Sequence, residues 1–473
     1  MDDIDSAAVT RDALSFRVGE KTPLKRSSWP MHHARSFVGP RSAQLRIAGL
    51  ALLFAGGCAP APHKGAWNQW GGPHRDFTAV EPQVAPAWPE PGPKKLWSRE
   101  LGDGFSTIVT DGHTLYTMYR ADAEHDAVVA LSAETGATRW EYKYAAPYLS
   151  TETDVIDMET GKKKTEPQVT KFGTGPNSTP LLVNGRLYAI GFTGILNCLD
   201  AHSGKLLWTR DLYREIGATY QMFGWATSPI AYGDTVIVLT GGKGHGVTAF
   251  DQATGKTAWQ ATDYECSYSS PILVNVDGQD HLVAYMSKDI IGVCPKTGEL
   301  HWSLEHKNQF GSTIATPLWC SGNRLFFVNG GDTAGGRVVK LARSADGKIM
   351  ATDMWTNKKI RGGLSNPVRV GEFIYGPNSA GENVKLITAV SVENGEIAWQ
   401  ERGVPGPKCI VIGERFIVLD DEGNLMLVEA NPKEMKVVSK TRLLEAPAWS
   451  APTLVGNRLY LRDRKTVMAL EVG

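Results

Sequence analysis

The sequence has no surplus of either charge and contains no long hydrophobic run. Its 473 residues include 50 Lys and Arg against 50 Asp and Glu. This balance argues against a generic nucleic-acid-binding protein, which needs a basic surplus to neutralise phosphates. No apolar run reaches the roughly 18–20 residues that a membrane-spanning helix requires. The hydrophobic content of 42% still suffices for a large core, so global disorder is excluded.

Cysteines are few, and their spacing points to no metal or redox site. None of the six forms a C-x-x-C pair, which is typical of zinc and haem attachment. The five that follow residue 58 are an odd number, so they cannot all pair internally. We expect these five to be small buried hydrophobic side chains: Cys198, Cys266, Cys294, Cys320 and Cys409.

The first apolar stretch of the chain has the features of an export signal. Ile47–Gly57 (IAGLALLFAGG) follows Arg35, Arg41 and Arg46, and no acidic residue lies in between. Small residues then precede Cys58, and a Pro/Ala tether follows it. This arrangement resembles the lipobox of bacterial lipoproteins, which implies cleavage before the cysteine and lipidation of its thiol.

One position departs from the lipobox, and a simpler interpretation stays open. Ala55 stands where the motif usually has Leu. The alternative is an ordinary secretory signal that is cut nearby, in which case Cys58 has no special role. Residues 1–30 are unusual in front of a signal peptide, so we expect translation to start at Met31 rather than at Met1.

A motif that ends in Trp recurs along the chain. VVALSAETGATRW (128–140) is repeated as LNCLDAHSGKLLW (196–208) and VTAFDQATGKTAW (247–259), among others. Each copy predicts a strand, a tight turn with Gly, and a second strand that carries Trp. The structural Trp positions are Trp97, Trp140, Trp208, Trp259, Trp302, Trp355 and Trp399.

A second motif precedes each copy, as in STPLLVNGRLYAI (178–190), and predicts strand, turn and strand. Together the motifs make eight copies of a four-strand unit. Successive Trp residues are 43, 68, 51, 43, 53 and 44 residues apart, and the long interval indicates an insertion near 150–171. A period of about 40–50 residues with four strands per unit predicts an all-β, eight-bladed β-propeller.

The ends of the chain complement each other. The last copy stops after its third strand at 467–472, and the missing Trp-bearing strand lies at 96–99. We therefore expect the N-terminal strand to complete the last blade and close the ring. The seventh copy lacks Trp and reads KVVSK around 437–438. The predicted domains are 1–57 (extension and signal peptide), 58–92 (tether and lead-in) and 93–473 (propeller).

The repeat resembles that of PQQ-like (pyrroloquinoline-quinone-type) propellers. This family includes quinoprotein alcohol dehydrogenases and BamB-like outer-membrane assembly lipoproteins. WNQWGGPHRD (67–76) is similar to an opening motif found in planctomycete-type members, although Gly71 replaces the usual Arg and His74 the usual Asn. The resemblance covers about residues 67–473 and bears on fold more than on activity, because function depends on sites rather than folds.

Several stretches invite a catalytic interpretation, but each has a simpler structural one. Quinoprotein dehydrogenases use PQQ, Ca²⁺ and often a vicinal disulfide, and this chain has no adjacent Cys pair. The acids of 152–159 are better explained by a hairpin in which Lys162–Lys164 pair across the strands. The Gly-rich stretches 240–246 and 329–336 do not match a P-loop and predict hairpin turns. Asp200 and Asp251 are expected to stabilise turns by accepting backbone N–H groups.

Residues just before each first strand lie on one face of a propeller, around its central channel. Aromatic rings with a few polar groups there make a plausible pocket lining, although they could equally plug the channel. Arg361 could hold an anion or a carbonyl edge, and a flat ring or a peptide could stack on Trp225 or Tyr268. The candidate positions are Phe105, Lys171, Asn177, Phe223, Trp225, Tyr268, Phe310, Arg361 and Trp449.

These features predict a non-catalytic scaffold of the cell envelope, monomeric and anchored by lipid at Cys58, in the periplasm or at the outer membrane. Its partners would be proteins or peptides, bound at the funnel or by β-augmentation at blade edges, without nucleic acid or cofactor. One alternative is a PQQ- and Ca²⁺-dependent dehydrogenase of alcohols or sugars. Another is a polysaccharide- or ligand-binding module.

Overall fold

A computed structural model describes residues 66–147, 152–156, 163–167, 173, 175–221, 223–306, 311–329, 334–378 and 385–473. The chain divides into two compact units, Met1–Gly56 and Gly57–Gly473, and all described residues belong to the second. The predicted signal peptide, Met31 and Cys58 lie outside the described residues. Among the residues described, no helix is long and apolar enough to cross a membrane.

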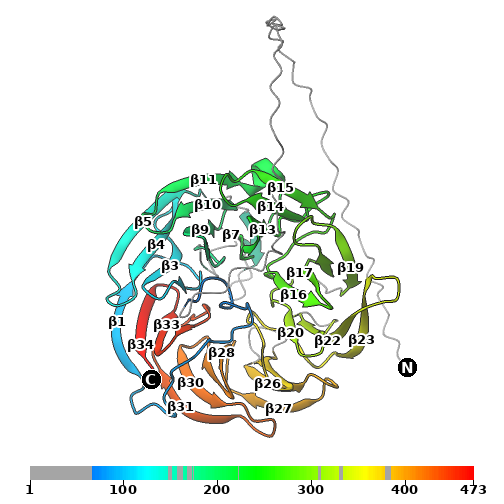
Figure 1. Ribbon diagram of the computed structural model, residues 1–473. Coiled ribbons are helices and arrows are strands. Elements are labelled where there is room, and N and C mark those ends of the chain that lie inside the picture. Colours follow the sequence, from blue (N-terminus) through cyan, green and yellow to red (C-terminus); the bar gives the residue numbers. More distant parts are fainter. Residues whose placement is uncertain are drawn as a thin grey trace, which may run out of the picture. The chain divides into compact units, whose positions relative to one another are not determined.

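Eight four-stranded antiparallel sheets surround a central channel, so the predicted all-β, eight-bladed propeller is confirmed (Figure 1). We number the blades in chain order. Blade 1 consists of β2 (Val109–Thr110), β3 (Thr114–Arg120), β4 (His125–Ser132) and β5 (Thr138–Ala145), and blade 2 of β8 (Leu181–Val183), β9 (Arg186–Ile190), β10 (Ile195–Asp200) and β11 (Leu206–Asp211). Blade 3 consists of β12 (Ile230–Tyr232), β13 (Thr235–Val238), β14 (Val247–Asp251) and β15 (Thr257–Ala261). Blade 4 consists of β16 (Ile272–Val276), β17 (Gln279–Tyr285), β18 (Asp289–Val293) and β19 (Leu300–Glu305).

The second half of the ring repeats this pattern and then closes it. Blade 5 consists of β20 (Leu318–Cys320), β21 (Arg324–Val328), β22 (Gly336–Arg343) and β23 (Ile349–Asn357). Blade 6 consists of β24 (Val368–Val370), β25 (Phe373–Pro377), β26 (Leu386–Ser391) and β27 (Ile397–Arg402). Blade 7 consists of β28 (Lys408–Ile412), β29 (Arg415–Leu419), β30 (Asn424–Glu429) and β31 (Lys436–Arg442). Blade 8 consists of β32 (Thr453–Val455), β33 (Arg458–Arg462), β34 (Thr466–Glu471) and, from the N-terminal side, β1 (Lys94–Glu100).

The predicted closure of the ring is confirmed by the pairing of β1 with β34. Trp97 lies opposite Ala469, and Arg99 lies opposite Val467. In blade 2 the second and third strands are almost wholly buried, whereas the outer fourth strand alternates between exposed and half-buried positions. This pattern follows from the pleat, because an outer strand packs one face on the next blade and turns the other to solvent.

The Gly and Trp of the repeat meet across blade boundaries rather than within a blade. A Cβ placed on Gly204, at φ +73°, would come within 2.6 Å of the Trp140 ring of the preceding blade. The Trp140 Nε1–H donates to the Ala201 carbonyl, 3.0 Å away. Gly255 packs on Trp208 in the same way, and the Trp208 indole donates to Gln252 O. Glycine is therefore needed both for the left-handed turn and for contact with the indole.

Blade 7 lacks this Trp, and the lead-in (residues 66–92) replaces it. The register places Ser439 opposite Leu427, which corresponds to Trp140 opposite Ala130 in blade 1. The indole of Trp88 donates to the Val472 carbonyl of blade 8, and the Trp88 N–H donates to Ser439 Oγ. An indole supplied from outside the blade thus occupies the boundary between blades 7 and 8.

The insertion between blades 1 and 2 contains a hairpin, as expected. β6 (Glu152–Ile156) pairs with β7 (Lys163–Pro167). The register places Lys163 and Lys164 opposite Ile156 and Val155, so the expected direct pairing of lysines with acids was wrong. A short π-helical turn, η1 (Leu212–Ile216), follows β11 and is capped by Asp211.

Three smaller predictions can be compared directly with the structure. Asp200 Oδ1 accepts from the N–H and hydroxyl of Ser203, and Asp251 Oδ1 does the same with Thr254, so both stabilise turns. The stretch 240–246 connects β13 with β14 as a hairpin turn. The five cysteines of the described region are free; Cys294 is half-buried, and Cys198, Cys266, Cys320 and Cys409 are buried, which raises the pKa of their thiols to between about 11 and about 12.

Candidate functional site

The central channel has two ends, which we call the entry face and the turn face. First strands begin at the entry face, and the turns between first and second strands lie at the turn face. The lead-in crosses the centre of the ring (Figure 1). It forms a bridge from Trp67 to Thr110 in blade 1 and a parallel bridge from Thr78 to Val411 in blade 7. Its backbone therefore pairs with two blades that flank blade 8, near the turn-face ends of their first strands.

Side chains of the lead-in hold it at the level of the first strands. Arg75 is only 3% exposed, and its guanidinium donates to the carbonyls of Ser228 and Pro229 in blade 3. Burial lowers the pKa of Arg75 to about 9. The indole of Trp70 donates to Thr316 Oγ1 in blade 5, 2.9 Å away. Together with the two bridges, these contacts tie four blades, 1, 3, 5 and 7, to one short segment.

The backbone of the lead-in is unusual for residues with side chains. Arg75 and Phe77 have φ values of 56° and 61°, a region that costs about 1–2 kcal/mol per residue. Gly71 also has positive φ, and a Cβ there would lie 2.9 Å from the Arg75 backbone. The Gly that departs from the family motif is thus required by the tight fold of this segment.

Polar side chains that precede the inner strands link neighbouring blades around the channel. The Thr179 N–H of blade 2 donates to Ser228 Oγ of blade 3, and the Ser228 N–H donates to Ser270 Oγ of blade 4. The Thr316 N–H likewise donates to Asn366 Oδ1 in blade 6. Each acceptor directly precedes a Pro at the start of a first strand. The Ser-Pro or Asn-Pro pair at these positions therefore marks the start of a first strand and also supplies a hydrogen bond between neighbouring blades.

Three of the predicted funnel residues come together at the entry face. Phe223 and Tyr268 have ring centroids 5.9 Å apart, and the Phe223 N–H lies 3.4 Å from the Tyr268 hydroxyl. Asn177 Nδ2 donates to the Phe223 carbonyl. Phe223 is 39% exposed, and nearby Tyr220 is 47% exposed. We call Asn177, Phe223 and Tyr268 the aromatic cluster.

Other predicted funnel residues are not part of this cluster. Phe105 and Trp449 stack on each other at 4.9 Å, between blades 1 and 8. Trp225 is fully buried, and its Nε1–H donates to Thr227 O, so no face of its ring is open to a ligand. The backbone N–H of Arg361 donates to Asn378 Oδ1 in blade 6. Lys171 and Phe310 lie outside the described residues.

Three carboxylates near the entry face are held in pairs with basic groups. Asp126 contacts Arg120 at 3.0 Å, and burial outweighs this contact and raises the pKa of Asp126 to about 6. Asp103 makes a two-pronged contact with Arg464, and Asp421 pairs with Lys408. In the described part of the chain, no group of three or more His, Cys, Asp or Glu could hold a metal ion. These residues do not fit a Ca²⁺ site, which requires six to eight oxygen ligands.

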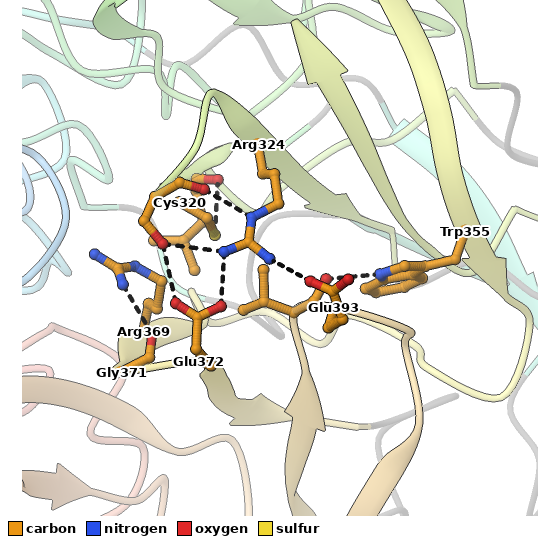
Figure 2. A network of polar contacts seen from close by, with 10 residues as sticks. Cys320, Arg324, Trp355, Arg369, Gly371, Glu372 and Glu393 are labelled. Atoms are coloured by element: carbon orange, nitrogen blue, oxygen red, sulfur yellow. Dashed lines mark hydrogen bonds and ion pairs between the residues drawn. The ribbon is translucent and has the colours of Figure 1, made fainter.

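On the turn face, charges link blade 5 to blade 6. Figure 2 shows Arg324 between Glu372 and Glu393, at 2.6 and 3.0 Å. The same guanidinium donates to the backbone and hydroxyl of Ser321. Trp355 donates to the Val392 carbonyl beside Glu393. The two ion pairs and the Trp355 contact join residues of blades 5 and 6, so the network belongs to the blade interface.

Comparison with known proteins assigns the family. A family model described as outer membrane protein assembly factor BamB matches residues 151–401, more than half of the chain. The chain belongs to this family.

Individual relatives match over short regions. BamB of Burkholderia pseudomallei is 31% identical over 133 residues, which are 28% of this chain and 27% of that protein. BamB of Moranella endobia is 31% identical over 150 residues, covering 30% and 32%. The matches thus span about a third or less of these relatives' own length.

Solved structures share the fold. BamB from Moraxella catarrhalis aligns with 80% of this chain and 97% of its own, with a TM-score of 0.54 and 17% identity. A europium-containing methanol dehydrogenase aligns with 84% of this chain and 89% of its own, with a TM-score of 0.58 and 13% identity. At such identities the likeness establishes the propeller and does not choose between scaffold and enzyme.

Proposed function

We propose that this protein is a non-catalytic scaffold of the cell envelope that binds a protein partner at its entry face, as part of an outer-membrane assembly machinery like that of its BamB relatives. The observation that carries the proposal is the lead-in, which crosses the ring and hydrogen-bonds to blades 1, 3, 5 and 7. The ring is thereby tied together from inside, and Phe223 of the aromatic cluster is exposed at the entry face. Exposed Tyr and Phe are common in protein-binding surfaces.

The predicted lipid anchor agrees with this orientation. Ala66 lies at the turn face, where it lines a groove with turn residues of blades 1 and 2. Eight residue steps separate Cys58 from Ala66, and a chain of that length spans at most about 28 Å. Lipidation at Cys58 would therefore keep the turn face near the membrane and leave the entry face for the partner.

Site-specific photocrosslinking tests the proposal. A photoreactive residue at Phe223 of the full-length chain in cells should crosslink to an envelope protein, which mass spectrometry identifies. The matched control is Met350, a 55% exposed residue on the outer strand of blade 5. Phe223→Asp should abolish co-purification of that partner, and Met350→Asp should not. Equal crosslinking at both positions would contradict a specific entry-face partner.

The dehydrogenase alternative has its own assay. Full-length protein mixed with PQQ and either Ca²⁺ or a lanthanide would be tested for dye-linked oxidation of alcohols and sugars. We expect no turnover. Sustained turnover would overturn the scaffold proposal. Anchoring is tested separately by Cys58→Ala, which should lose palmitate labelling and leave the membrane fraction; unchanged partitioning would refute lipidation at Cys58.

A further inference from the structure

A groove of about 820 Å³ lies on the turn face between blades 1 and 2, far from the aromatic cluster in the fold. The turns between the first and second strands of both blades and the turn between β10 and β11 form its walls, and Ala66 and Asn68 of the lead-in border it. Its volume falls within the range of about 300–1,000 Å³ that is typical of small-ligand sites. Neither the scaffold proposal nor the channel uses any of its polar side chains.

Two carboxylates in the groove are fixed through one oxygen each. Asp111 Oδ1 accepts the N–H groups of His113 and Thr114, at 2.8 and 2.7 Å. Asp200 Oδ1 accepts the N–H and hydroxyl of Ser203, and these bonds lower the pKa of Asp200. Within the described part of the chain, Oδ2 of both aspartates makes no hydrogen bond. The groove therefore holds two oriented acceptors that are open to a ligand.

Donors stand beside these acceptors. Arg139 NH2 donates to the His113 carbonyl at 3.1 Å, and NH1 donates to Thr114 Oγ1 at 2.9 Å. A guanidinium has five N–H donors, so this positioned group keeps further donors for a ligand. The exposed rings of His113 and His202 line the groove and hydrogen-bond to no described residue. A neutral imidazole offers one donor and one acceptor.

The charges and the apolar lining together define the kind of ligand. Two carboxylates disfavour an anion, and the guanidinium disfavours a simple cation. Side chains of Leu182 and Val183 add apolar wall to the groove. A neutral polyhydroxylated molecule matches this set, because each hydroxyl can donate to a carboxylate and accept from Arg or His while its C–H face packs on apolar carbon. We propose that this groove is a binding site for a neutral saccharide.

Titration calorimetry on the full-length chain in detergent tests the site. The probes are three neutral trisaccharides (maltotriose, cellotriose and chitotriose) and one uronic-acid trisaccharide. We expect at least one neutral probe to bind and the uronic acid to bind more weakly. Asp200→Asn keeps an oxygen for the Ser203 turn and removes the charge, and should weaken binding about tenfold. His202→Ala removes an exposed ring and should also weaken binding without a change in melting temperature.

The control is His74→Ala, an exposed histidine of the lead-in that does not line the groove. It should bind the saccharide like the unaltered chain. The proposal would be overturned if no neutral probe bound, or if the uronic acid bound more tightly than the neutral probes. It would also be overturned if the Asp200 and His202 variants bound the saccharide with the same affinity as the unaltered chain. Because the site lies away from the aromatic cluster, these results are independent of the partner crosslinks.

Discussion

Replacement of Trp88 by Ala tests whether an indole from the lead-in closes the boundary between blades 7 and 8. The Trp88 side chain is 8% exposed and packs in the same cluster as Leu427, Leu470 and Val472. Removal of a buried Trp typically costs about 3–5 kcal/mol, which includes the cavity. We therefore expect Trp88→Ala to lower the free energy of unfolding by about that amount, measured by equilibrium denaturation followed by circular dichroism.

Two companion variants separate packing from hydrogen bonding. Trp88→Phe keeps most of the ring but loses the bond to the Val472 carbonyl, so we expect a smaller loss of about 1–2 kcal/mol. Ser439→Trp, in the Trp88→Ala background, places an indole where the other blades carry theirs and should restore part of the stability. Val437→Ala, at a 43% exposed position of the same outer strand, is the control and should change stability by less than about 0.5 kcal/mol. A cost below about 1 kcal/mol for Trp88→Ala would refute the reasoning.

Three further predictions follow from the same contacts. His281 and His306 are buried, and burial lowers the pKa of each from 6.5 to about 4. The stabilisation that depends on neutral imidazoles is therefore fully present above pH 6.5 and is lost as the pH drops towards 4. At pH 5 the free energy of unfolding should be lower by about 1–2 kcal/mol per histidine. The double variant with Asn at 281 and Gln at 306 should flatten this pH dependence in denaturant titrations, and an unchanged slope would contradict it. Arg75→Met should cost about 2–4 kcal/mol, because the Ser228 and Pro229 carbonyls lose their donor, and a neutral result in thermal melting would show that the lead-in does not brace blade 3. Gly255→Ala should destabilise by more than about 1 kcal/mol, since its φ is +68° and its Cβ would meet Trp208, whereas Gly233→Ala, with positive φ but open space, should cost less.

The repeat made the ring predictable, because its strands, turns and Trp positions recur at a regular period. The pairing of β1 with β34 followed from a missing strand at one end and a surplus strand at the other. Asp200 and Asp251 were predictable because their turn contacts are local in sequence.

The role of the lead-in could not be predicted in the same way. Its partners are remote: Trp70 lies 246 positions from Thr316, and Trp88 lies 384 positions from Val472. No local sequence pattern predicts contacts between residues so far apart in the chain. One signal was nevertheless present, since the seventh copy lacks a Trp and the lead-in contains Trp residues outside the repeat.

The predicted funnel residues show a second limit of prediction from the sequence. Periodicity placed them all before first strands, but it could not tell which rings would be covered. Trp225 entered the core, whereas Phe223, two positions earlier, stayed 39% exposed. The difference depends on packing against Tyr213, which belongs to a π-helical turn that the repeat does not contain.

The pairing of β1 with β34, the last strand, has a consequence for biosynthesis. Lys94 and Glu471, which form an ion pair, are 377 positions apart, so β1 leaves the ribosome long before its partner exists. Throughout synthesis the nascent chain carries β1 without its partner strand, and non-local pairing of this kind is slow and exposed to aggregation. A polypeptide that terminates before β34 can never bury that edge. Ring closure therefore distinguishes chains that include β34 from truncated ones and gives chaperones and proteases a physical criterion for which chains to keep.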